Sequence, residues 1–304
     1  MSTYLITGGA GFIGTNLSER LVHEGHRVVI VDDLRAGTDP ARLPKEVVLH
    51  RFDICDTTKL TSCMKNERVD IVVHLAALPS VQFSIDHPFE AQHVNIDGTL
   101  SVLEAVREAG IRRIVYAASS AAYGDQETLP LSESLPAQPK SPYALHKYTG
   151  EHLMRMWHII HGIQTISLRF FNVYGPYFDP KGAYALVMGK FMRQRSEGVP
   201  MTITGDGEQT RDFVHVRDIA DALYKASTNE SVGHGEVFNV GSGRNASINE
   251  IAHMIGGPVE YIAPRIEPRH TRADIALIQQ VLGWKPEVRL EDGISELKKQ
   301  FGIV

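Results

Sequence analysis

The stretch TGGAGFIG, residues 7–14, decides the fold of this chain. It follows the short apolar run Tyr4–Ile6 and opens a helical pattern of apolar residues from Ile13 to Leu21. Glycines in a strand–helix loop let the backbone turn tightly and bring the helix N-terminus against a pyrophosphate, although such loops also use glycine for packing alone. The stretch therefore predicts a strand–loop–helix unit that binds a dinucleotide. Its expected cofactor contacts are Gly8, Gly11, Phe12, Ile13 and Gly14.

Further short apolar runs alternate with helical patterns along the first half of the chain. Buried parallel strands have this appearance, and strands that alternate with helices indicate βαβ units. One long helix is expected from Pro88 to Ala109, ending at Gly110. We predict an α/β protein with a doubly wound parallel sheet of the Rossmann type. The expected strands are Tyr4–Thr7, Arg27–Val31, Val47–His50, Ile71–Leu75, Arg113–Ala117 and Thr165–Leu168.

The composition of the sequence changes after Phe170. Glycine and proline become frequent there, and the predicted strands become short. We expect a dinucleotide-binding domain over residues 1–169 and a smaller α/β substrate domain over residues 170–304. The segment 213–245 is a candidate for a return to the first domain, because Val237–Val240 is a strand-like run.

Acidic residues follow the second and third predicted strands. Asp32 ends the second strand, where a carboxylate accepts hydrogen bonds from the adenosine ribose and repels a 2′-phosphate, so NAD is favoured over NADP. Asp33 either assists or caps the following turn, and Asp53 either reaches the adenine or caps a helix. The small segment Leu75, Ala76 and Ala77 after the fourth strand lets backbone approach the cofactor.

Tyr143 and Lys147 form a YxxxK pattern at the start of a predicted helix, which places both side chains on one face. A free tyrosine has a pKa of about 10, and a nearby ammonium group together with the positive nicotinamide ring favours its phenolate. Ser119 follows the fifth strand, at the sheet edge where doubly wound folds bind their ligands. There it is either a proton relay to Tyr143 or an ordinary turn former. The order glycine loop, Asp32, Ser119 and YxxxK predicts a catalytic site for proton and hydride transfer.

Composition narrows the class of protein. The net charge of −5 and the absence of a basic stretch argue against nucleic-acid binding. The two cysteines, Cys55 and Cys63, form no CxxC pattern, and no long apolar segment is visible, so we expect a cytoplasmic protein without a membrane span. His158 and His161 are spaced i, i+3 on a predicted helix but have no further ligand pattern, so no metal is expected.

The chain resembles the NAD-dependent epimerase/dehydratase branch of the extended short-chain dehydrogenases/reductases, and within it the UDP-glucose and UDP-N-acetylglucosamine 4-epimerases. The resemblance is carried nearly end to end by TGGAGFIG, HLAA, SSAAYG, PYALHK, LRFFNVYGP, GDGEQTRDFVHV and LGWKP. It implies resident NAD, a catalytic triad of Ser119, Tyr143 and Lys147, and a homodimer built through the helices near 88–109 and 143–160. It also implies further cofactor contacts from Ile54, Asn95 and Phe170, and substrate contacts from Val81, Ser119, Ser120, Tyr143, Asn172, Arg211, Arg265 and Thr271.

Two of the implied substrate contacts have competing interpretations. Arg211 supplies a planar guanidinium suited to a diphosphate, but it also fits a surface ion pair with Asp212. Arg265 stands in the sequence RIEP, which departs from the expected Arg-Pro-Gly-Asp, and Arg269 or Arg272 can take its role.

The residues after Ser119 favour one reaction among those of the family. Relatives that eliminate water or carbon dioxide carry carboxylates where this chain has Ser120 and Ala121. Without that acid, return of the hydride to the opposite face of a 4-ketose is the simplest outcome, and it inverts C4. A UDP-glucuronate 4-epimerase, another nucleotide-sugar oxidoreductase and a non-enzymatic NAD sensor remain as alternatives. By resemblance, Thr271 stands where tyrosine excludes an N-acetyl group, which predicts that both glucose and N-acetylglucosamine forms fit.

Overall fold

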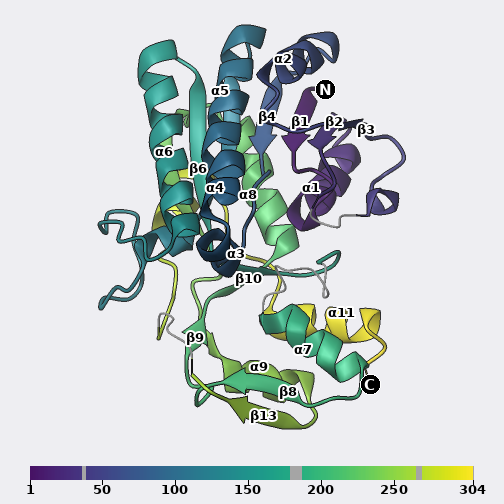
Figure 1. The fold of residues 1–304 in the computed structure, drawn as a ribbon, viewed down its shortest axis with the longest axis vertical. Helices are drawn as coiled ribbons and strands as arrows, with labels where there is room; N and C mark the ends of the chain where they lie inside the picture. Colours follow the sequence, from purple (N-terminus) through teal and green to yellow (C-terminus); the bar gives the residue numbers. More distant parts are fainter. Residues whose placement is uncertain (36–38, 179–186, 265–268, 304) are drawn as a thin grey trace.

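Seven parallel strands form the central sheet of the protein (Figure 1). The computed structural model describes residues 1–35, 39–178, 187–264 and 269–303. The strand order is β11-β6-β5-β4-β1-β2-β3, so the chain winds outward in both directions from β1 and β4, as predicted for a doubly wound fold. The strands are β1 (Thr3–Thr7), β2 (Arg27–Asp32), β3 (Val48–Arg51), β4 (Ile71–His74), β5 (Arg113–Ser119), β6 (Gln164–Phe170) and β11 (His234–Val240).

The register of the strands aligns the polar residues that end them. Thr7 at the end of β1 is paired with His74 of β4. Ser119 of β5 is paired with Phe170 of β6, which in turn pairs with Val240 of β11. The carboxyl ends of all these strands therefore form one edge, and side chains from distant parts of the sequence meet there.

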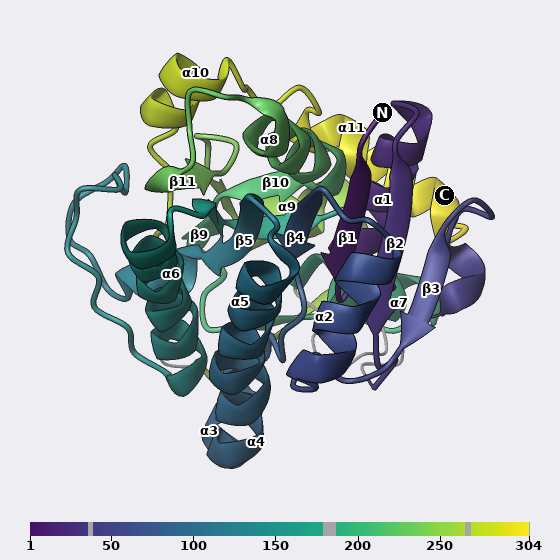
Figure 2. The ribbon, with the colours of Figure 1, turned by 90° about the horizontal axis from the view of Figure 1, so that it is seen from above.

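Helices cover both faces of the sheet because successive strand residues point to opposite sides. Leu5 and Val29 face α2 (Thr57–Asn66), α5 (Gly98–Ala109) and α6 (Pro142–His161), whereas Tyr4 and Val28 face α1 (Phe12–His23) and α8 (Val216–Thr228). Figure 2 shows the two helical layers on either side of the strands. The core is thus divided by the sheet into two apolar layers.

The predicted helix from Pro88 to Ala109 is interrupted. It consists of α4 (Pro88–Gln92), a π-helical turn (His93–Asp97) and α5, whose end is capped by Gly110 in a left-handed conformation. A π turn widens the helix by one residue and is frequent at functional sites. Here it contains Asn95, whose side chain is buried and turned toward the loop after β4.

A second lobe follows β6 in the chain and is drawn at the bottom of Figure 1. Its core is formed by α7, α9 and α11 with two short strands, β8 and β13, which pair in parallel. The segment 213–245 contributes α8 and β11 to the main sheet layer, while α10 also packs on β11. The domain division itself stays a prediction. The lobe's elements are α7 (Val187–Ser196), β8 (Met201–Thr204), α9 (Ile248–Ile255), β13 (Val259–Ile262) and α11 (Leu290–Gln300), whereas α10 (Ala276–Leu282) belongs to the core of the main sheet.

The remaining elements are short. Two further two-stranded ladders join β7 (Asn172–Tyr174) to β10 (Phe213–His215) and β9 (Thr210–Arg211) to β12 (Ala246–Ser247). Short helices are found at α3 (Val81–Asp86), at Pro40–Arg42 and at Ser120–Tyr123. Among the residues described, no helix combines the length and apolar character needed to cross a membrane.

Candidate active site

The glycines of the loop between β1 and α1 have different roles. Gly8 has a φ of +67° and lies so close to the end of β4 that a Cβ atom would be 2.7 Å from the Ala76 backbone. A Cβ on Gly14 would be 2.5 Å from the backbone of Gly9. A Cβ on Gly11, by contrast, would approach only the Gly8 carbonyl oxygen, at 3.2 Å. Gly8 and Gly14 thus allow close contact between backbone segments. The space beside Gly11 is open.

The first turn of α1 offers N–H groups beside that open space. Gly11 is the N-cap residue, and no side chain caps the turn that begins with Phe12 and Ile13. Helix N-termini favour anions because their first N–H groups lack partners within the helix. The residues present therefore fit a dinucleotide pyrophosphate, as predicted.

Asp32 is buried beside the loop and connects it to β2. Its carboxylate accepts hydrogen bonds from the backbone N–H of Ala10 (3.0 Å) and of Leu34 (2.8 Å). Burial raises the pKa of Asp32 above its ordinary value, although these two hydrogen bonds oppose the shift. A carboxylate oxygen accepts more than one hydrogen bond, so the ribose interaction predicted for Asp32 fits this arrangement.

Asp33 and Asp53 both lie against Arg35. The Arg35 guanidinium bridges the two carboxylates, while Asp33 also caps the turn at Arg35 and Asp53 caps the turn at Cys55. Partial burial opposes ionisation of Asp53, but bonds from Cys55 and Arg35 outweigh it and lower its pKa. The N-cap of α2 is Asp56 rather than Asp53. The predicted adenine contact of Asp53 stays a prediction.

The loop after β4 is held by a directional chain of hydrogen bonds. Thr99 donates to the Asn95 carbonyl (2.8 Å), so its oxygen accepts from His74 Nε2 (3.0 Å), and His74 Nδ1 accepts from the Thr7 hydroxyl (2.7 Å). The Asn95 side chain completes the chain, because it both accepts from Leu78 N–H and donates to Leu78 carbonyl. This arrangement fixes the backbone of Leu75, Ala76 and Ala77 beside the glycine loop. The Asn95 side chain therefore holds the loop after β4 in place through its two hydrogen bonds with the Leu78 backbone.

Ser119 and Tyr143 lie close together. The Ser119 side chain caps the short helix that follows it, accepting from Ala121 N–H (3.2 Å), and it is near enough to the Tyr143 hydroxyl to influence its pKa. The interpretation of Ser119 as a turn former is thus confirmed, and its role as a proton relay stays a prediction. Tyr143 starts α6, and its backbone N–H donates to Ser84 of α3 (3.0 Å). The predicted pair is assembled at the carboxyl edge of the sheet.

Lys147 is buried one helical turn beyond Tyr143. Its ammonium group donates to the Ala117 carbonyl (2.7 Å) and lies 4.9 Å from the centre of the Tyr116 ring. Burial lowers the pKa of Lys147 to about 7. Lysine and tyrosine therefore share one face of α6, as the i, i+4 spacing predicts.

Burial of the hydroxyl raises the pKa of Tyr143, and the nearby Ser119 side chain only partly offsets this effect. The lowering expected from Lys147 and the positive nicotinamide ring together stays a prediction. Tyr143 as a residue is half-buried, but its hydroxyl is densely surrounded by protein, so a phenolate loses hydration there. The protein groups around Tyr143 therefore do not by themselves favour ionisation of its hydroxyl to the phenolate.

The two remaining cofactor candidates are core residues. Phe170 ends β6 and is buried beside Ser119, in a position that fits a contact with the nicotinamide half. Ile54 is buried under α5, where a Cβ on Gly98 would meet its side chain. The Ile54 side chain therefore packs against α5. Its backbone follows Asp53 directly in the chain.

The predicted substrate residues come from several segments. Asn172 at the start of β7 donates its side-chain N–H to the Asp212 carbonyl (3.3 Å), and Arg211 is buried with its guanidinium on the Thr210 carbonyl (2.9 Å). Thr271 lies in the segment paired with Thr210 and has a buried hydroxyl with no hydrogen-bond partner within the described structure. Val81 is exposed on α3. Arg265 lies outside the described residues.

The competing interpretation of Arg211 as half of a surface ion pair is wrong. The Asp212 side chain is completely buried, and its carboxylate is hydrogen bonded to Ser242, Gly243 and Ala273. Adjacent residues in an extended segment point to opposite sides, which the sequence could have indicated through the strand-like alternation of this stretch.

Ser119 is followed by Ser120 and Ala121, neither of which carries a carboxylate. Both residues belong to a short helical turn. Two acidic side chains on neighbouring elements are committed elsewhere. Glu151 of α6 forms a buried two-point ion pair with Arg169, and Glu133 accepts from the Asn239 backbone (2.8 Å). The described site thus offers an alcohol, a phenol and an ammonium group, without an evident acid for elimination.

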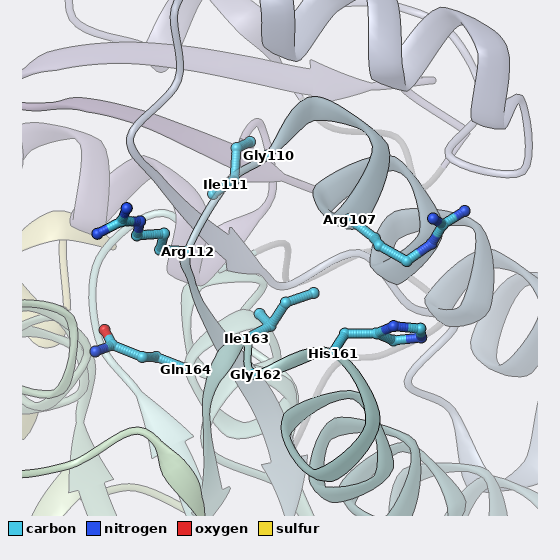
Figure 3. A pocket seen from close by; sticks show the side chains of 8 residues that line it. All are labelled: Arg107, Gly110, Ile111, Arg112, His161, Gly162, Ile163 and Gln164. Atoms are coloured by element: carbon cyan, nitrogen blue, oxygen red, sulfur yellow. The ribbon is translucent and has the colours of Figure 1, made fainter.

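A surface hollow lies at the opposite edge of the sheet (Figure 3). It is lined by the turns that follow α5 and α6, including Arg107, Arg112 and His161. Arg107 and Arg112 extend in opposite directions in Figure 3, so they do not converge on one ligand. Within the described ranges, no three His, Cys, Asp or Glu side chains gather in a way that could hold a metal ion.

Comparison with known proteins places this geometry in a family. The sequence matches the NAD dependent epimerase/dehydratase family over residues 4–241. It is 38% identical over 301 residues to a putative UDP-glucose 4-epimerase of Methanocaldococcus jannaschii, covering 96% of each chain. The structure is similar to UDP-glucose 4-epimerase of Thermotoga maritima solved with UDP-glucose (TM-score 0.93, 32% identity, 99% and 98% of the two chains covered). It is also similar to UDP-glucose 4-epimerase of Thermus thermophilus solved with NAD (TM-score 0.91, 32% identity, 99% of each chain covered). The chain belongs to the NAD-dependent epimerase/dehydratase family.

Proposed function

We propose that this protein catalyses the NAD-dependent 4-epimerisation of a UDP-hexose through a transient 4-keto intermediate. The observation that carries the proposal is the placement of Ser119, Tyr143 and buried Lys147 together, at the same sheet edge as the glycine loop. The substrates are UDP-glucose and UDP-galactose, with the N-acetylhexosamine forms admitted by the small Thr271.

The side chains have complementary roles in this reaction. Tyr143 accepts the proton of the sugar 4-hydroxyl, and Ser119, which lies beside it, holds that oxygen and relays the proton. Bound NAD supplies the acceptor and then the donor of the hydride at C4, and its positive ring favours the phenolate that burial alone disfavours. Rotation of the ketose in the site would present the opposite face of C4 to the returning hydride, and Tyr143 gives its proton back to the oxygen, so that C4 is inverted.

The same residues argue against elimination as the outcome. Ser120 and Ala121 carry no acid, and Glu151 is neutralised by Arg169. A ketose formed at this site therefore has no nearby general acid to expel a hydroxyl group, and return of the hydride is the reaction that the groups present support.

Tyr143→Phe tests whether the protein is an enzyme or an NAD-sensing protein. The variant keeps the ring but removes the hydroxyl. We expect turnover of UDP-glucose to fall by at least about a thousandfold, while NAD affinity, measured by calorimetry, changes by less than about threefold. Ser119→Ala provides a second variant with a smaller expected loss. Unchanged turnover in Tyr143→Phe contradicts the proposal.

We further propose a homodimer formed through α5 and α6. These neighbouring helices expose apolar side chains on their outer faces, which supports an interface with a second copy. Ile159→Asp is expected to yield a monomer in light scattering, whereas Val259→Asp, on the second lobe, leaves the dimer intact. The exposed residues are Leu100, Leu145, Met156, Ile159 and Ile160.

The cytoplasm is the proposed compartment. Cys55 and Cys63 are both free thiols in the structure, which suits a reducing environment. Localisation of a fluorescent fusion in the source cell tests the assignment.

A further inference from the structure

The Asp212 carboxylate is a meeting point for separate segments of the chain. It is completely buried between β9 and β10. One oxygen accepts from the backbone N–H (2.6 Å) and the hydroxyl (2.7 Å) of Ser242, and the other from the N–H groups of Gly243 (3.0 Å) and Ala273 (2.9 Å). All four donors are neutral. This buried acid therefore organises backbone.

The segments gathered in this way carry the proposed substrate contacts. Ala273 is two residues beyond Thr271, and Arg211 immediately precedes Asp212. The Asp212 carbonyl also accepts from the backbone N–H (3.0 Å) and the side chain of Asn172 (3.3 Å). Three residues from distant parts of the sequence are thus fixed relative to one another through one residue.

Packing around the carboxylate leaves little room for adjustment. A Cβ on Gly241 would be 2.6 Å from the Ala273 side chain and 2.9 Å from an Asp212 oxygen. Burial raises the pKa of Asp212, and the four hydrogen bonds oppose that shift by stabilising the ionised form. The geometry requires four acceptor positions on two oxygens, which an ionised carboxylate supplies and an amide does not.

We propose that Asp212 is a positioning residue that assembles the diphosphate and sugar subsite from the segments of Asn172, Arg211 and Thr271. The inference rests on the proposed function for the identity of the ligand. Asp212 does not touch the substrate; it sets the distance between groups that do. Replacing it by asparagine turns an NH2 group toward one pair of donors, so either the 242–243 loop or the 273 segment loses its anchor.

The test compares ligands that occupy the two halves of the site. For Asp212→Asn we expect the Kd for UDP, used alone as the probe, to rise by at least about tenfold, with a similar rise in KM for UDP-glucose. The Kd for NAD is expected to stay within about twofold, because the glycine loop and Asp32 lie on other segments. Asp221→Asn, a surface acid on α8 paired with Arg20, is the matched control and should change neither affinity.

A second variant keeps the proposal falsifiable if Asp212→Asn fails to fold. Ser242→Ala removes one of the four donors and leaves the backbone donors in place, so the Kd for UDP should rise by about threefold with NAD unaffected. Equal losses of UDP and NAD affinity, or unchanged UDP affinity in a folded variant, would overturn the role of Asp212. Wild-type protein that binds UDP but epimerises no sugar contradicts the proposed function alone, whereas failure of the wild type to bind UDP overturns both.

Discussion

Replacing Glu151 by glutamine should destabilise the protein far more than the same change at a surface ion pair. Glu151 and Arg169 form a two-point pair with oxygen–nitrogen distances of 2.8 and 2.7 Å, and their side chains are only 4% and 5% exposed. The substitution preserves shape but leaves the Arg169 cation buried without its counter-charge. Breaking such a pair on one side costs about 3–5 kcal/mol.

Glu104 provides the matched control. Two nitrogens of Arg107 donate to one of its carboxylate oxygens at 2.9 and 2.7 Å, and the side chains are 33% and 42% exposed, so this pair is far less buried than the pair of Glu151. An exposed pair contributes about 0–1 kcal/mol, and we expect Glu104→Gln to cost less than about 0.5 kcal/mol.

Chemical denaturation with linear extrapolation measures both variants. The double variant Glu151→Leu with Arg169→Met should be more stable than Glu151→Gln alone, because it buries no unpaired charge. The reasoning is refuted if Glu151→Gln costs less than about 1 kcal/mol, or if the two glutamine variants lose equal stability.

Three further changes have contrasting expected outcomes. Gly14→Ala forces its Cβ against the loop backbone and should lower the unfolding free energy by about 2 kcal/mol, whereas Gly11→Ala folds normally and loses NAD affinity; denaturation and calorimetry separate the two. Burial lowers the pKa of His74 to about 3 and that of His215 to about 4, so these two side chains take up protons mainly in the unfolded chain as the pH falls from about 6.5 toward 4. Unfolding free energy should decrease over that window, by up to about 1.4 kcal/mol per pH unit per histidine; a flat profile contradicts this. Thr271→Tyr should reduce turnover of UDP-N-acetylglucosamine by at least about tenfold relative to UDP-glucose in a competition assay, and an unchanged ratio removes Thr271 as the size determinant.

The sheet was predictable because buried parallel strands have an unusually clear sequence pattern. The six apolar runs all became strands, and helices cover both faces of the inner ones, whereas the edge strand β3 is only partly buried. The seventh strand, β11, has the sequence HGEVFNV, in which only the end is apolar. Its first residues are partly exposed, so the sequence indicated only Val237–Val240.

The site was only partly predictable because much of it depends on contacts between distant residues. Ser119, Tyr143 and Lys147 were found from local spacing, and the structure brings them together. Burial of the Tyr143 hydroxyl, which raises its pKa, could not be foreseen, since spacing on a helix says nothing about how deeply a hydroxyl is buried. The hydrogen-bond chain through His74 joins the ends of β1 and β4, and no local sequence pattern indicates it.

Asp212 illustrates the same limit for the second lobe. In sequence it is the neighbour of Arg211, and a surface pair was a reasonable interpretation. Its partners are 30 residues or more away, at Ser242, Gly243 and Ala273. A single sequence gives no measure of such pairing, whereas a completely buried acid in the structure demands an explanation.

Proton NMR of the purified wild-type protein with UDP-glucose, and separately with UDP-N-acetylglucosamine, tests the central claim most directly. No NAD is added at first. The account predicts the galacto anomeric signal with resident cofactor, at rates that allow both sugars to be compared. No change with either sugar after NAD is supplied would contradict the substrate assignment. A keto-sugar or pentose product would instead show that the ketose is consumed by elimination or decarboxylation, contrary to the role inferred from Ser120 and Ala121.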